Sequence, residues 1–273
     1  MIKYSINEIS QIVNGKIIGD EKKNVWQIQI DSRQYFSPEG QLFIALKGER
    51  YDAHKYIPDL LANKKCSCFI VEYVPSNLNY DKKDVTFIIV ENSTKALQIL
   101  ASYHRKKFNY PVIAITGSNG KTIVKEWLFH LLSIKYNIIK SPKSYNSQIG
   151  VPLSILNMDY NYDIGIFEAG ISQKGEMEKL EKIICPTIGI ITNIGEAHQE
   201  NFKSYEEKTE EKLKLFENCN TIFCCKDHDI IFASLKEKRK KNQSIITWSF
   251  YGDADLIIKD IKKNASNSII LGQ

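Results

Sequence analysis

The sequence predicts an α/β protein with two domains, a small amino-terminal domain and a larger one built on a parallel sheet. The chain has 273 residues, more than the usual domain size of about 100 to 200 residues. From residue 112 onward, short apolar segments alternate with segments of helical periodicity, as in a parallel sheet covered by helices on both faces. The Tyr110-Pro111 pair interrupts the chain between the two patterns, so we expect domains at 1–107 and 108–273.

The amino-terminal domain shows runs rich in β-branched and aromatic residues, which predict strands, and two segments with helical spacing. The expected strands are 25–31, 42–46, 67–72 and 85–90, and the expected helices are 56–63 and 93–106. Ser93 and Thr94 are candidate caps for the second helix, because a hydroxyl there can accept hydrogen bonds from the first N–H groups.

The second domain has a more regular order of elements. The expected strands are 112–116, 137–140, 163–168, 187–192 and 221–224, with helices at 121–133, 176–183 and 204–217. We expect strand 221–224 to close the series, and the apolar run 268–271 predicts one more strand at the end of the chain. Ligands of such sheets bind at the carboxyl ends of the strands, so the loops that follow the strands are the place to look for function.

Composition narrows the class of protein. Hydrophobic residues make up 43% of the chain and charged residues 25%, which excludes wholesale disorder. The formal net charge of +5 favours anionic ligands in general. The densest basic run, Lys236 to Lys241, has no interleaved aromatic residues, so we interpret it as a solvated helix end and expect no nucleic-acid partner.

The cysteines and the amino terminus bear on the compartment. None of the six cysteines forms a C-x-x-C pair, so we expect reduced, mostly buried thiols instead of a zinc or redox site. No apolar run approaches the roughly 20 residues that span a bilayer, and the first residues lack a signal-peptide core. We expect a cytoplasmic monomer with no membrane partner.

The sharpest motif is T-G-S-N-G-K-T, from Thr116 to Thr122, between an apolar strand and a helix. A glycine-rich turn there lets backbone N–H groups surround phosphate oxygens, and the helix dipole adds positive potential. Lys121 would neutralise the β- and γ-phosphates, and the Thr122 hydroxyl would bind Mg²⁺. The residues expected to bind ATP are Gly117, Ser118, Asn119, Gly120, Lys121 and Thr122. The alternative is a helix start without a ligand.

Two further loops follow apolar strands in the same domain. Glu168 ends the strand 163–168, where a carboxylate beside a phosphate loop is well placed to hold Mg²⁺. His198 lies in T-N-I-G-E-A-H, immediately after the strand 187–192. A lone histidine is more often structural, but both loops should open on the edge that carries the phosphate loop.

The phosphate loop resembles the ATP loop of the Mur ligase superfamily, which also contains folylpolyglutamate and cyanophycin synthetases. The stretches E-A-G-I-S-Q-K-G-E and T-N-I-G-E-A-H are similar to those of the branch that adds D-alanyl-D-alanine to UDP-N-acetylmuramoyl-tripeptide, and above all to ligases fused to an alanine racemase. No racemase segment can be located in this chain. The resemblance implies an acyl-phosphate mechanism with ATP and Mg²⁺ in cytoplasmic peptidoglycan synthesis.

The resemblance also implies roles for single residues. In S-Y-N-S-Q-I-G-V-P-L, Asn146 matches a position that contacts the UDP-sugar, although Ser147 stands where most members have a second asparagine. In D-S-R, Ser32 and Arg33 match the family's uridine-nucleotide domain. Alignment of the helix 204–217 places at Lys212 the family's lysine that carries a CO₂-derived carbamate and binds a second Mg²⁺ with His198. Lys212 and Arg33 could instead be ordinary surface cations.

Family members continue through the rest of the central domain and a third domain, so we expect this chain to be carboxy-terminally truncated, with an incomplete central ATPase domain that could leave it inactive alone. Three rival interpretations remain open. They are a superfamily ligase that adds another amino acid, a P-loop NTPase of another class, and a non-catalytic nucleotide-binding fragment.

Overall fold

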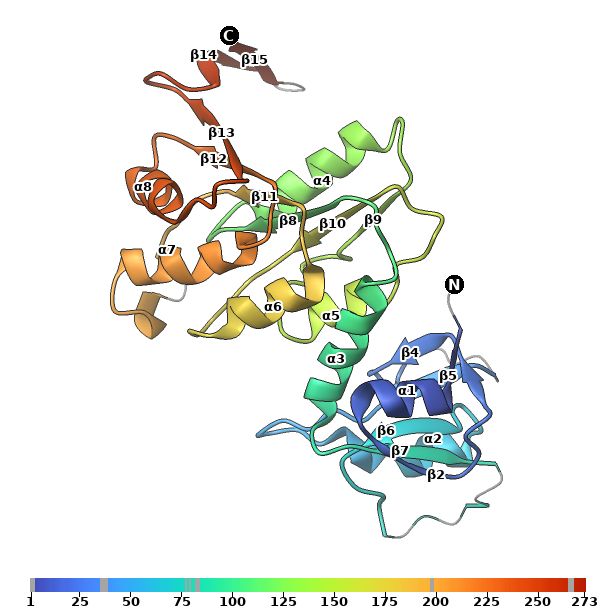
Figure 1. The fold of residues 1–273 in the computed structure, drawn as a ribbon. Coiled ribbons are helices and arrows are strands. Elements are labelled where there is room, and N and C mark those ends of the chain that lie inside the picture. The colour runs from blue at the N-terminus through green and yellow to red at the C-terminus, as the bar shows by residue number, and fades with distance from the viewer. Residues whose placement is uncertain are drawn as a thin grey trace. The chain divides into compact units, whose positions relative to one another are not determined.

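The computed structural model describes residues 3–34, 39–76, 78, 80, 81, 84–196, 199–264 and 268–273. The chain divides into two compact units. The amino-terminal unit comprises Met1–Phe108 and Ile155–Asp159, and the central unit comprises Asn109–Ser154 and Tyr160–Gln273. Each contains helices and a mostly parallel sheet, so the predicted α/β class is confirmed (Figure 1).

The amino-terminal unit is built on a five-stranded sheet in the order β2-β7-β6-β5-β4, in which only β2 runs antiparallel to its neighbour. Strands β1 and β3 pair separately. The elements are β1 (Tyr4–Ser5), α1 (Ile6–Val13), β2 (Lys16–Ile18), β3 (Asn24–Val25), β4 (Gln27–Gln29), β5 (Gln41–Ile44), a 3-10 turn (Ala53–Tyr56), α2 (Ile57–Ala62), β6 (Cys68–Val71), β7 (Thr86–Ile89) and α3 (Ser93–Arg105).

The prediction of a single strand at 25–31 is wrong, because the chain pairs with two different strands within this range. β3 pairs antiparallel with β1, whereas β4 pairs parallel with β5. The N–H groups of Trp26 and Gln27 both donate to the carbonyl of Gly40, at 2.9 and 3.0 Å. This shared acceptor marks the point where the backbone passes from one sheet to the other.

Two further expectations for this unit need correction. The cap of α3 is Asn92, whose side chain accepts a hydrogen bond from the N–H of Lys95 at 2.8 Å; Ser93 and Thr94 already lie inside the helix. The helix α1 was not predicted at all. Ser5 caps it, and its residues Ile6, Ile9 and Val13 are buried, so its short amphipathic pattern was present in the sequence.

The central unit contains an eight-stranded sheet in the order β15-β14-β13-β12-β11-β8-β10-β9. All neighbouring pairs are parallel except β14 and β15. The elements are β8 (Val112–Thr116), α4 (Lys121–Leu132), β9 (Ile138–Lys140), α5 (Gly150–Ile155), β10 (Ile164–Glu168), α6 (Glu176–Ile184), β11 (Ile188–Ile191), a 3-10 turn (Gln199–Asn201), α7 (Tyr205–Leu213), a 3-10 turn (Lys214–Phe216), β12 (Thr221–Cys225), α8 (Asp229–Lys238), β13 (Ser244–Ser249), β14 (Leu256–Lys263) and β15 (Ser268–Gly272).

The middle of this sheet is buried on both faces. Ile113, Ile115 and Ile166 face α4, whose Val124 and Leu128 pack against them. In Figure 1, α4 lies on one side of β8 and β10, and α6 lies on the other. Five consecutive buried residues in β8 explain why its sequence is continuously apolar.

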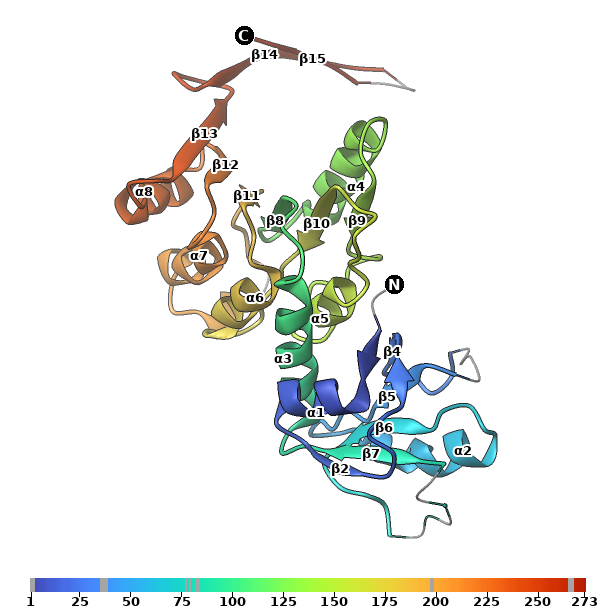
Figure 2. The ribbon, with the colours of Figure 1, turned by 45° about the vertical axis from the view of Figure 1, so that its right-hand side comes forward.

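The sheet extends further than we expected. Strand β12 does not close the series, because α8, β13, β14 and β15 follow it. Figure 2 shows the β14–β15 hairpin at the end of the sheet, beyond the helices. Helix α5 was also missed, because a proline usually argues against a helix. Pro152 is the third residue of α5, however, and it therefore lies in the first turn, where a helix tolerates proline.

Two expectations about side chains agree with the structure. All six cysteines are free, and five of them are buried. The basic run begins in the last turn of α8, which ends at Lys238, and continues into exposed residues. Across the described ranges, no helix is both long enough and apolar enough to cross a membrane.

Candidate functional site

The phosphate loop connects β8 to α4 in a conformation that its glycines permit. Gly117 has φ 142° and Gly120 has φ 82°, values that side-chain-bearing residues rarely adopt. A Cβ atom on Gly117 would lie 1.9 Å from Thr192 Oγ1. Gly120 caps α4 without a side-chain hydrogen bond, so the helix presents its first N–H groups without a competing side chain.

A second loop, at 192–195, braces the phosphate loop. It follows β11, which lies next to β8 in the sheet. Asn193 accepts the Ser118 N–H on its carbonyl at 2.8 Å and the Asn119 N–H on its side chain at 3.1 Å. Thr192 Oγ1 donates to the Asn119 carbonyl at 2.6 Å, and Ser118 Oγ accepts the Gly195 N–H at 2.9 Å. The phosphate loop is therefore held from the neighbouring strand end.

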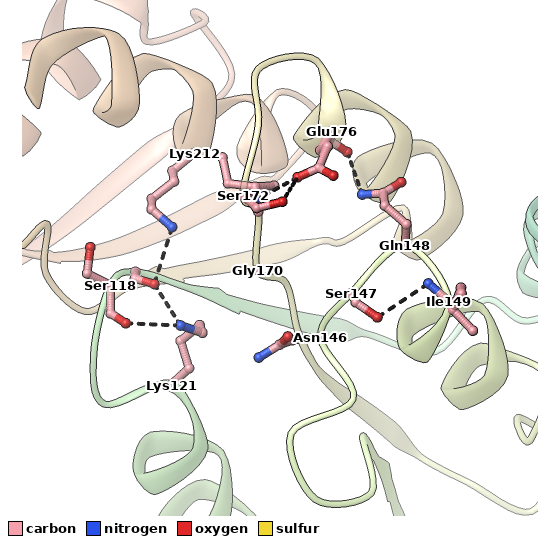
Figure 3. A pocket seen from close by; sticks show the side chains of 12 residues that line it. Ser118, Lys121, Asn146, Ser147, Gln148, Ile149, Gly170, Ser172, Glu176 and Lys212 are labelled. Carbon is pink, nitrogen blue, oxygen red and sulfur yellow. Dashed lines mark hydrogen bonds between the residues drawn. The ribbon is translucent and has the colours of Figure 1, made fainter. Parts of the chain in front are cut away.

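Two lysines from different helices converge on the carbonyl of Gly117. Lys121 Nζ donates to it at 2.8 Å and to the Ser118 carbonyl at 3.2 Å. Lys212 Nζ reaches the same Gly117 oxygen at 3.3 Å from α7 (Figure 3). Both amino groups thus lie beside the phosphate loop, and Lys121 lies where a phosphate or phosphoryl group bound to the loop would need charge compensation.

The environment of Lys212 lowers its basicity. The side chain is buried, and burial, with the nearby charges of Lys121 and Lys208, lowers the pKa of Lys212 to about 7. Lys208 lies one helical turn earlier in α7 and is itself buried, with its Nζ 2.5 Å from the Gly195 carbonyl. Burial also lowers the pKa of Lys121, against the opposing effect of Glu168. The sequence left open that Lys212 is an ordinary surface cation. Its burial shows that it is not.

Thr122 and Glu168 form a pair of oxygen donors beside the phosphate loop. Glu168 is fully buried at the end of β10, and its Oε2 accepts a hydrogen bond from Thr122 Oγ1 at 3.1 Å. Octahedral Mg²⁺, with bonds of about 2.1 Å, holds neighbouring ligand oxygens about 3 Å apart. In the described part of the chain, no three His, Cys, Asp or Glu side chains gather into a cluster. The donors present fit Mg²⁺, which uses one or two protein oxygens together with phosphate.

A cavity of about 380 Å³ opens beside the phosphate loop. It is lined by the phosphate loop, Lys212, residues 146–149 and residues 170–172, with Glu176 (Figure 3). The Asn146 side chain lies at the cavity in Figure 3, and the backbone carbonyl of Asn146 accepts the Gly170 N–H at 2.8 Å. Glu176 accepts the Ser172 N–H at 2.7 Å, which orders the loop after β10.

The remaining predicted site residues lie elsewhere or outside the described chain. His198 is not among the described residues. Ser32 and Arg33 belong to the amino-terminal unit. The Arg33 side chain is exposed and forms a bidentate pair with Asp31, at 2.9 and 2.8 Å. This pairing lowers the pKa of Asp31 to about 2.

The sequence reasoning missed three residues that the structure brings to the site. Asn193 and Lys208 hold loops there, and Lys125 contacts Glu168 from a fully buried position on α4. Lys125 follows Lys121 by four residues, so both side chains lie on one side of α4. A second lysine one helical turn after Lys121 was the available signal.

Comparison with known proteins agrees with this arrangement. Residues 115–271 match the model of the Mur ligase middle domain. The UDP-N-acetylmuramoyl-tripeptide--D-alanyl-D-alanine ligase of Buchnera aphidicola (subsp. Acyrthosiphon pisum) is 35% identical over 258 residues, which cover 89% of this chain and 54% of the relative. The chain spans about half the length of the curated relatives that it matches.

Solved structures show the same likeness. MurF from Acinetobacter baumannii matches with a TM-score of 0.85 and 26% identity, over 100% of this chain and 61% of the other. MurF ligase from Thermotoga maritima, solved in complex with ADP, matches with a TM-score of 0.75 and 28% identity, over 90% of this chain and 55% of the other.

Proposed function

Because this chain belongs to the Mur ligase family, we propose that it serves the ATP-dependent joining of D-alanyl-D-alanine to UDP-N-acetylmuramoyl-tripeptide in the cytoplasm. One observation carries the proposal. A single cavity is lined by the phosphate loop, by Asn146 and by the buried Lys212, three features that a ligase of this kind needs in one place. Two curated relatives named for this reaction match 98% and 62% of the chain.

The proposed reaction activates a carboxylate in two steps. The terminal carboxylate of the tripeptide attacks the γ-phosphorus of ATP, which forms an acyl phosphate and releases ADP. The amine of D-alanyl-D-alanine then attacks the acyl carbon, loses a proton and expels phosphate. Lys121 and the first N–H groups of α4 would hold the nucleotide phosphates, and their charge would stabilise the transferring phosphoryl group.

Metal binding is part of the same proposal. Thr122 and Glu168 would hold Mg²⁺, which when bound offsets the negative charge of the phosphates. Lys212 would carry a carbamate, because only a neutral amine takes up CO₂ and its surroundings lower its pKa to about 7. Together with His198, the carbamate would supply oxygen and nitrogen ligands for a second ion.

Substrate binding completes the proposal. Asn146 would donate to the UDP-sugar from the cavity wall, and Ser32 and Arg33 would bind the UDP-linked substrate in the amino-terminal unit. The Arg33 guanidinium is 88% exposed, so it can reach an anionic ligand by exchanging Asp31 for a phosphate or carboxylate.

Isothermal titration of the 273-residue chain tests these assignments. Wild-type protein is titrated with Mg·ATP and, separately, with UDP-N-acetylmuramoyl-tripeptide. Lys121→Ala is expected to weaken ATP binding about 10- to 100-fold, because it removes charged hydrogen bonds worth about 1.5 to 3 kcal/mol. Lys135→Ala is the matched control, since Lys135 is exposed and follows the far end of α4.

Each result has a definite meaning. Binding of both ligands, with ATP binding that depends on Lys121 and not on Lys135, supports the proposed ligase. A folded chain that binds ATP but not the UDP-peptide would favour another amide ligase of the superfamily. A folded chain that binds neither would contradict the proposal.

A further inference from the structure

Lys125 is a fully buried cation that the proposed chemistry does not use. Its side chain is 0% exposed, and its ammonium group contacts four oxygens. It donates to the carbonyls of Ser141 and Lys143, at 3.0 and 2.5 Å. It also lies 3.0 Å from Glu168 Oε1 and 3.2 Å from Glu126 Oε1. A buried lysine is costly unless it is paired in this way, so these contacts define its place in the fold.

The two oxygens of Glu168 are divided between two partners. Oε1 faces Lys125 in an ion pair and accepts no hydrogen bond of good geometry among the described residues, whereas Oε2 accepts from Thr122 Oγ1. The Glu168 N–H donates to Ser141 Oγ at 3.2 Å. Lys125 therefore links the Glu168 carboxylate to the residues that follow β9. The other carboxylate oxygen, Oε2, remains available to Thr122.

A lysine so close to a metal-binding carboxylate could either position it or compete with the ion. Competition would dominate if the ammonium charge acted alone. Here the charge is shared with Glu126, which also pairs with Lys140. The alternating series Lys140, Glu126, Lys125 and Glu168 has no net formal charge, so repulsion of an incoming cation is largely offset and the geometric effect remains.

We propose that Lys125 is a positioning residue, which holds the Glu168 carboxylate so that one oxygen faces Thr122 and can bind the Mg²⁺ ion of a bound nucleotide. This inference rests on the proposed nucleotide-binding function. Lys125 itself contacts neither the nucleotide nor the metal. It acts by orienting the carboxylate of Glu168.

The test measures ADP binding to the 273-residue chain by isothermal titration, over a series of Mg²⁺ concentrations and in EDTA. The proteins are wild type, Lys125→Met and Lys125→Gln. Mg²⁺ should strengthen ADP binding, and the Mg²⁺ concentration that gives half of this effect is the quantity compared. In both variants this concentration should rise about 10- to 100-fold, as it does when a hydrogen-bond partner of a metal ligand is removed. ADP affinity in EDTA should not change, because Lys121 and the loop are intact.

Lys140→Met is the matched control. It removes a lysine from the same series of charges without touching Glu168, so its Mg²⁺ requirement should equal that of wild type. Thermal unfolding shows which variants are folded and, repeated with Mg²⁺ and ADP, gives a second measure of binding. If Lys125→Met does not fold, Lys125→Gln decides the question, since it removes the charge and keeps an N–H donor for the carbonyls.

Three outcomes would overturn the inference. A folded Lys125 variant with an unchanged or lower Mg²⁺ requirement would show that the ammonium is neutral toward the ion or competes with it. Wild-type protein that binds ADP without any effect of Mg²⁺ would remove the metal role and leave nucleotide binding intact. Wild-type protein that binds no ADP would instead refute the proposed function on which the inference rests.

Discussion

Lys212 shows how one residue acquires chemistry from its surroundings. A solvent-exposed lysine keeps its proton near neutral pH, since its ordinary pKa is about 10.4. Lys212 is buried near two other lysines, which lowers its pKa to about 7. Burial and like charge both disfavour the ammonium form. The neutral amine is therefore available at physiological pH, as carbamate formation requires.

This shift predicts that Lys212 takes up CO₂ in a pH-dependent way. With dissolved ¹³CO₂ held constant, a carbamate carbon signal in NMR should be weak below pH 7 and grow as the pH rises through about 7. The sign follows from the lowered pKa, because the reactive neutral amine is the form that gains population with rising pH.

Two variants assign that signal. Lys212→Met should abolish it, whereas Lys214→Met should keep it, since Lys214 lies at the end of the same helix and pairs with Glu211 at 2.6 Å. A carbamate signal that persists in Lys212→Met would contradict the assignment.

Among the elements, the phosphate loop depends on the loop that follows β11. Five hydrogen bonds join residues 118 and 119 to residues 192–195, and the Gly117 Cα lies against Thr192. The loop conformation is therefore a property of two adjacent strand ends. Neither segment alone determines it.

This packing predicts a large cost for Gly117→Ala. The left-handed backbone alone costs an alanine about 1 to 2 kcal/mol, and the clash with Thr192 Oγ1 adds to it, so we expect a total loss of about 3 kcal/mol or more of unfolding free energy. Urea denaturation followed by circular dichroism measures it.

Gly175→Ala is the control for backbone strain alone. Gly175 also has a positive φ, of 82°, but a Cβ there would meet nothing within 4 Å, so only the strain of about 1 to 2 kcal/mol should appear. Thr192→Ala should recover part of the loss in Gly117→Ala, because it removes the clashing hydroxyl. Equal losses in the two glycine variants would refute the steric account.

For the whole molecule, the division into two units has a consequence for ligand binding. The phosphate loop, its bracing loop and the cavity all belong to the central unit, whereas the sheet β2-β7-β6-β5-β4 belongs to the amino-terminal unit. A ligand stabilises the part of a protein whose folded form binds it, and proteins open in separate cooperative units.

Hydrogen exchange should therefore respond to Mg·ADP in one unit only. We expect slower amide exchange at residues 117–122 and 192–195 and in β8, and unchanged exchange in β5, β6 and β7. Mass spectrometry of peptides from both units, with and without ligand, makes the comparison. The Lys121→Ala variant, treated in the same way, should lose the effect. Equal protection in the two units would contradict their independence.

The sequence by itself determined the order of strands β8 to β12 and of helices α4, α6 and α7 in the central unit, and the position of the phosphate loop. These features depend on local periodicity and on glycines within a few residues of one another, so they can be recognised without knowledge of distant contacts. The same local reasoning failed for residues 24–29, where Gly40, distant in sequence, divides the predicted strand between two sheets.

Only the tertiary structure decided which charged residues are buried and what they face. The local sequence does not show that Lys125, Lys208 and Lys212 are buried, yet all three contact segments that follow other strands. The pKa of a side chain and the direction of a carboxylate oxygen depend on desolvation and on charges within a few ångströms. Those distances exist only once the strands have come together.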